Sequence, residues 1–169
     1  MGEPVKGWSL PDEEYMACSE GIPENHHYRD LRWIEWSDFE RLCGETRELL
    51  ELTERYEDED ELCEAACDNE VYMLDIDPEV APAVFALAAA GAVPFTACSG
   101  NPGHYESHPL VGFWSDPDLR ESILAAANLA GAQVEPAGYD ALVLYHESDS
   151  AALINFAHFL KASRVHVDR

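Results

Sequence analysis

From Val71 to the C-terminus, short apolar runs alternate with helical patterns, and this order constrains the fold more than any other feature of the sequence. We predict strands at five apolar runs: residues 71–76, 93–98, 110–114, 133–135 and 141–146. Helices are predicted between and after these runs, over residues 77–90, 116–131 and 149–160. The order β-α-β-β-α-β-β-α includes the β-α-β-β-α-β arrangement of ferredoxin-like domains. The expected fold is therefore α+β: a mixed sheet with helices packed on it, with a ferredoxin-like core plus an extra strand and helix.

Residues 1–70 have a different character. We predict them to be an acidic segment, partly irregular and partly helical, that precedes an α/β sandwich domain over residues 71–169. The sequence Ser37-Asp-Phe-Glu40 has the form of a capping box, which predicts the start of a helix. The five consecutive acids at residues 57–61 are either a solvated linker or the start of a second, short helix.

The chain is strongly acidic, with a formal net charge of −24, and this charge is unevenly distributed. Residues 1–80 carry 25 Asp and Glu against six Lys and Arg, whereas residues 81–169 carry nine against four. Like charges at this density repel one another and oppose folding. We therefore interpret these acids as serving solubility or the binding of a positively charged partner. The same charge repels nucleic acids and anionic membranes, which argues against direct binding of either.

The acidic helical region, with its aromatic neighbours, is the candidate partner-binding surface. A solvated helix face is the alternative interpretation of these acids. However, aromatic side chains are common anchors inside a charged rim, and their presence favours binding. We therefore predict a non-enzymatic protein that docks on a basic protein and neutralises it, as an immunity protein or a nucleic-acid-mimicking inhibitor does. The residues predicted to contact this partner are Trp33, Trp36, Glu48, Glu51, Tyr56, Asp58, Glu59, Asp60 and Glu61.

The five cysteines form an odd, scattered set, which is typical of reduced thiols in the cytosol rather than of a disulfide framework. The N-terminus lacks the basic start and apolar core of a secretion signal, and no apolar run is long enough to span a bilayer. We therefore predict a cytoplasmic protein. Cys63 and Cys67 are four residues apart, which fits either two metal ligands on one helix face or part of an apolar stripe.

The connection between the predicted strands 93–98 and 110–114 carries the alternative prediction, a small enzyme or a metal- or ligand-binding protein. In a catalytic site, Cys98 and Ser99 would act with His104 and His108, and a histidine would activate the thiol. In a metal site, Cys98, His104 and His108 would bind zinc. The glycines of this loop could instead bring the backbone close to a small ligand. The remaining interpretation is structural, with a buried cysteine, turn-forming glycines and surface histidines.

The segment Thr96-Ala-Cys-Ser-Gly100 resembles the Ser-Ser-Cys-Ser-Gly-Arg segment of the tRNA wybutosine-synthesising methyltransferase family over about five residues. Asn101 stands where that family has a basic residue. The net charge of the chain is also opposite to what tRNA binding requires. The activity of that family is therefore not transferred to this chain.

Overall fold

The computed structural model describes residues 31, 33–101, 106–138 and 140–165. Within these ranges the protein is α+β, with six helices and one four-stranded sheet. No helix in these ranges is long and apolar enough to cross a bilayer. The elements in chain order are α2 (Trp36–Arg55), α3 (Glu59–Ala66), α4 (Glu70–Met73), α5 (Ala81–Ala89), β1 (Val93–Cys98), β2 (Leu110–Trp114), α6 (Pro117–Ala130), β3 (Gln133–Gly138), β4 (Ala141–Tyr145) and α7 (Ser150–Val165).

The sheet is antiparallel throughout, and its strands lie in the order β1-β2-β4-β3. It consists of two pairs of consecutive strands, and α6 connects the second strand of the first pair to the first strand of the other. In the central pair, Val111 lies opposite Leu144 and Phe113 lies opposite Leu142. These four side chains belong to the hydrophobic core, so they share the face of the sheet that the helices cover. The strand bounds confirm four of the predicted strands, with small shifts at their ends. These are the strands predicted at residues 93–98, 110–114, 133–135 and 141–146.

The predicted ferredoxin-like core and mixed sheet are not found, because residues 71–76 do not form a strand. Asn69 caps a short helix instead. Its side-chain oxygen accepts a hydrogen bond of 3.1 Å from a backbone N–H in the first turn of α4. Val71 is buried whereas Met73 is 61 % exposed, so alternate residues do not share a face as they would in a strand. Asp75 then adopts a positive φ of 54°, which turns the chain after the helix.

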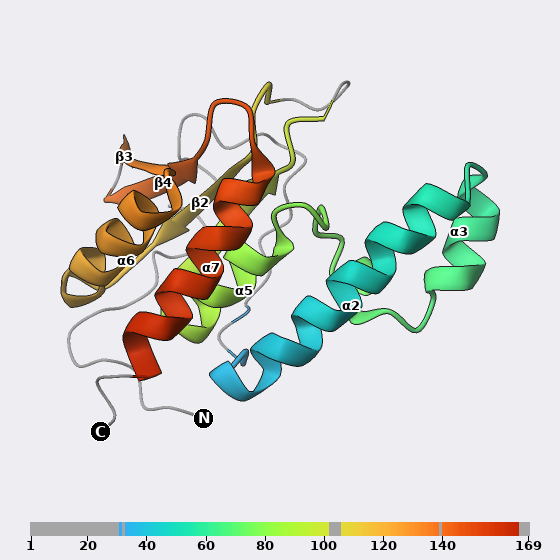
Figure 1. Ribbon diagram of the computed structural model, residues 1–169, viewed down its shortest axis with the longest axis horizontal. Helices are drawn as coiled ribbons and strands as arrows, with labels where there is room; N and C mark the ends of the chain where they lie inside the picture. The colour runs from blue at the N-terminus through green and yellow to red at the C-terminus, as the bar shows by residue number, and fades with distance from the viewer. Residues whose placement is uncertain (1–30, 32, 102–105, 139, 166–169) are drawn as a thin grey trace.

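The core lies between the sheet and the helices α5, α6 and α7, and α2 packs against α5 (Figure 1). α5 is apolar on every side, and its residues 81–88 are all buried. Phe39 and Leu42 from α2 belong to the same core cluster as Phe113 of the sheet and Phe156 of α7. The first half of α2 is therefore part of the same core as the sheet.

α2 begins slightly before its predicted start. The expected capping box was Ser37 with Glu40, but the helix begins at Trp36 and the cap is Glu35. The Asp38 carboxylate accepts a hydrogen bond of 3.1 Å from the backbone N–H of Glu35. The same physical device is therefore used two residues earlier in the chain.

Of the two predictions for residues 57–61, the helix is the one found. Asp58 caps α3, and its carboxylate accepts the backbone N–H groups of Asp60 at 3.0 Å and Glu61 at 3.1 Å. Acids in the first turn are favourable because the N-terminal end of a helix carries partial positive charge. This explains why a run of acids can start a helix here.

Candidate partner-binding site

The second half of α2 and α3 form a helical hairpin that projects from the sheet and from the helices that cover it (Figure 1). At about 1.5 Å per residue, the twenty residues of α2 span about 30 Å. No residue of α2 beyond Leu49 is buried, although the helix continues to Arg55. We call residues 48–68 the acidic arm.

The acidic arm carries a dense set of exposed acidic residues. Ten acidic residues lie in this segment of the chain, and Arg55 is its one basic residue. Carboxylates in such number, with one arginine among them, produce a negative potential that extends into the solvent and attracts cations. The ten acids, all exposed, are Glu48, Glu51, Glu54, Glu57, Asp58, Glu59, Asp60, Glu61, Glu64 and Asp68.

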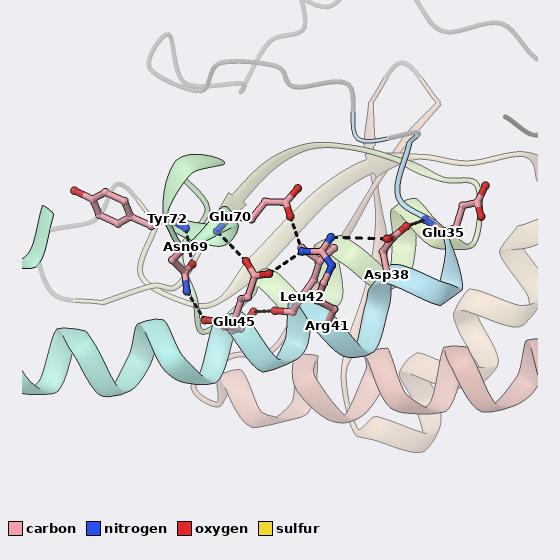
Figure 2. A network of polar contacts seen from close by, with 9 residues as sticks. Glu35, Asp38, Arg41, Leu42, Glu45, Asn69, Glu70 and Tyr72 are labelled. Atoms are coloured by element: carbon pink, nitrogen blue, oxygen red, sulfur yellow. Dashed lines mark hydrogen bonds and ion pairs between the residues drawn. The ribbon is translucent and has the colours of Figure 1, made fainter. Parts of the chain in front are cut away.

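A network of ion pairs at the base of the arm fixes α2 against α4 (Figure 2). The Arg41 guanidinium donates to Glu45 at 2.7 Å and to Glu70 at 2.6 Å. The other carboxylate oxygen of Glu45 accepts the backbone N–H of Glu70 at 2.8 Å. The hydrogen bonds to Glu70 and then to Glu45 raise the pKa of Arg41 above its usual value.

Two further contacts hold the arm in place. The Asn69 side-chain amide donates to the backbone carbonyl of Glu45 at 2.9 Å, so the chain that leaves α3 is tied back to the middle of α2 (Figure 2). Ala66 of α3 is completely buried, and Leu52 and Leu62 pack against the core cluster from the two helices of the hairpin. The helices that carry the acids are therefore held in a defined arrangement by contacts within the protein itself.

The predicted contact residues fall into two groups that lie at opposite ends of α2. Glu48, Glu51 and Tyr56 lie in the arm together with residues 58–61, and Tyr56 is half-buried at the end of α2. Trp33 and Trp36 lie at the other end, where Trp33 is 45 % exposed. The Trp36 ring packs edge-to-face on the core residue Phe39, with 5.6 Å between ring centroids. The structure therefore does not place the two tryptophans beside the acids.

The acidic surface is larger than the sequence analysis predicted. Four exposed acids of the arm were not included in the predicted set: Glu54, Glu57, Glu64 and Asp68. Their spacing gave a usable signal, because residues three or four apart on a helix lie on one face. The packing of α3 against α2 had no such local signal.

The alternative site, in the chain between β1 and β2, is described only in part. Cys98 is buried, and its sulfur accepts the backbone N–H of Gly100 at 3.4 Å. Ser99 is also buried, and its backbone N–H donates to the Asp77 carboxylate at 2.8 Å. The His108 ring packs edge-to-face on Tyr145, with 5.5 Å between centroids. His104, which completes both the predicted catalytic set and the predicted zinc site, lies outside the described residues.

Within the described ranges, no group of three or more His, Cys, Asp or Glu side chains is arranged to hold a metal ion. Cys63 lies on α3 and Cys67 directly follows that helix, both in the acidic arm, and Cys98 lies at the end of β1. The apolar stripe that would have buried Cys63 and Cys67 is not found, because both thiols are exposed. Ala66 is the one buried residue of α3.

Comparisons of this chain with protein-family models, with curated proteins and with solved structures gave no match.

Proposed function

We propose that this protein is a cytoplasmic binding protein whose acidic arm docks on a basic protein. The arm would block the surface through which that basic protein acts. The observation that supports the proposal is the arm itself, where ten exposed acids and one arginine lie on a hairpin that projects from the core. The cytoplasm is the proposed setting because Cys43, Cys63 and Cys67 are free thiols.

Charge complementarity would give such a protein fast and selective association. An acidic surface steers a basic partner into contact and raises the association rate, and it repels other anionic molecules. The network around Arg41 and Glu45 adds pre-organisation, because the arm does not have to become ordered on binding. Both effects depend on the arm, so they predict that its acids matter more than acids elsewhere.

The spacing of the acids favours a partner that binds nucleic acid. Glu48, Glu51 and Glu54 repeat every three residues along α2, which corresponds to a rise of about 4.5 Å per carboxylate. One strand of DNA carries a phosphate about every 3.4 Å along its axis. The linear charge density along this part of α2 is thus about three-quarters of that of one nucleic-acid strand. We therefore propose an immunity-type or nucleic-acid-mimicking inhibitor of a basic nuclease-like or nucleic-acid-binding protein.

The proposal is tested by capture of partners from a lysate of the source cells, with three immobilised forms of the protein. The first is the wild type, and the second carries Glu48→Gln, Glu51→Gln and Glu54→Gln. The third is a matched control with Asp118→Asn, Glu121→Gln and Glu147→Gln, which removes three exposed charges outside the arm. Asp58 is left intact because it caps α3.

We expect the wild type and the matched control to retain the same basic protein at low salt, and the arm variant to lose it. The retained protein should be released at high salt and should lose its nucleic-acid-dependent activity when the wild type is added back. If no basic protein is retained at low salt, or if the arm variant retains it as well as the wild type does, the proposal is wrong.

A further inference from the structure

Two exposed thiols lie one helical turn apart on α3. α3 ends at Ala66, but Cys67 at its C-cap keeps helical dihedral angles, with φ −60° and ψ −24°. Cys63 and Cys67 therefore retain the spacing of residues four apart in a helix, for which the Cβ atoms are about 5–6 Å apart. Both side chains are exposed and both thiols are free.

This separation suits a bridging ion better than a disulfide. A disulfide requires Cβ atoms about 3.5–4.5 Å apart, so these two cysteines cannot be joined without distorting the helix. A metal–thiolate bond is about 2.3 Å long in zinc proteins, so an ion between two sulfurs separates them by up to about 4.6 Å. Side chains on neighbouring turns of a helix can present their sulfurs at that distance.

The surroundings of the pair favour a cation. α3 carries Glu59, Asp60, Glu61 and Glu64, and Asp68 follows it, without a basic residue in the same stretch.

We propose that Cys63 and Cys67 form a binding site for a soft monovalent metal ion of the Cu(I) class. Thiolates select soft ions such as Cu(I). Two sulfur ligands in a nearly linear arrangement complete the coordination of such an ion. A structural Zn²⁺ site needs four ligands, and the described residues offer no group of three His, Cys, Asp or Glu that could hold a metal. On binding, each thiol releases one proton to solvent, and the pair and the ion form two metal–sulfur bonds. This inference is independent of the proposed protein partner.

The test is an anaerobic titration of the full chain with Cu(I) in competition with the chelator bathocuproine disulfonate. The proteins compared are the wild type, Cys63→Ser, Cys67→Ser and the double variant, with Cys18→Ser as a matched removal of a thiol. Cys43 is not a competing ligand, because it is buried in the core and burial raises its pKa to about 11. Serine keeps the size of the side chain, and far-UV circular dichroism checks that each variant is folded.

We expect the wild type and Cys18→Ser to bind one Cu(I) with equal affinity. Loss of either arm cysteine should weaken binding about 100-fold, because a ligand that chelates through two linked groups loses most of its affinity when one is removed. X-ray absorption at the copper edge should show two sulfur neighbours. The proposal is overturned if the wild type and the double variant bind Cu(I) equally well, or if Cys18→Ser loses as much affinity as the arm variants do. It is also overturned if oxygen atoms dominate the first coordination shell of the copper.

Discussion

At the residue scale, Gly100 occupies a position that only glycine fits. Its φ is +73°, and a Cβ built there would lie 2.4 Å from the backbone carbon of His108. Both the left-handed conformation and the collision with backbone oppose any side chain. We expect Gly100→Ala to lower the free energy of unfolding by at least about 2 kcal/mol, measured by urea denaturation.

The matched control is Gly44→Ala in the middle of α2. A Cβ at Gly44 meets no atom within 4 Å, and no positive φ is involved. Alanine is the better helix former, so this substitution should raise the free energy of unfolding by about 0.5–1 kcal/mol. If Gly100→Ala does not lower the free energy of unfolding, the close approach of Gly100 to His108 is not what limits the choice of residue.

At the element scale, an ion pair joins the start of α2 to the end of α7. Lys161 donates to the Glu40 carboxylate, and its ammonium also lies over the Phe39 ring, 5.1 Å from the centroid. The hydrogen bond from Lys161, followed by the charge of Lys161, lowers the pKa of Glu40 below its usual value of 4.5. The Glu40 side chain is 65 % exposed, so the pair contributes less than about 1 kcal/mol.

The lowered pKa gives this pair a defined pH dependence. Because the folded pKa lies below the unfolded one, the stabilisation is fully present above pH 4.5 and is lost as pH falls through the folded pKa. We expect the wild type to be more stable than Lys161→Met near neutral pH, and this difference to shrink steadily below pH 4.5. Arg55→Met is the control, because Arg55 is exposed in the acidic arm and distant from Glu40. The measurement is urea denaturation at a series of pH values, and a difference that does not change with pH would contradict the expectation.

Local sequence signals predicted four strands correctly and failed at residues 71–76. The confirmed strands are apolar runs with Gly or Pro near their ends, which is a local pattern. Residues 71–76 have the same composition, but the Asn69 cap and the burial of Val71 favour a helix there. The strand order could not be read from these signals, because the pairing of β2 with β4 joins segments separated by the whole of α6.

For the candidate site, the acids of the arm were predictable from composition and helical spacing, since charge is a property of the sequence itself. The projection of the arm was not, because it depends on how α3 packs on α2 through residues such as Ala66. The distance of Trp33 and Trp36 from the acids was missed for a related reason. Both are close in sequence to the acidic helix, but one helix of twenty residues separates its two ends by about 30 Å.

At the scale of the whole molecule, the net charge of −24 should make salt stabilising. Screening lengths shorten from about 30 Å at 0.01 M salt to about 8 Å at 0.15 M, which weakens repulsion among the exposed acids. We expect the melting temperature to rise over this range. The rise should be smaller for the variant with Glu48→Gln, Glu51→Gln and Glu54→Gln, because fewer negative charges repel one another in its acidic arm. Calorimetry at the two salt concentrations measures this, and a melting temperature that falls with salt would contradict it.

The uninterrupted course of α2 has one further consequence. The helix that presents Glu51 and Glu54 to solvent is the same rigid rod that buries Phe39 and Leu42 in the core. The position of the arm is therefore set by the packing of Phe39 and Leu42 at the other end of the same continuous helix. The proposed basic partner would therefore be recognised by its shape and its angle of approach as well as by the sign of its charge.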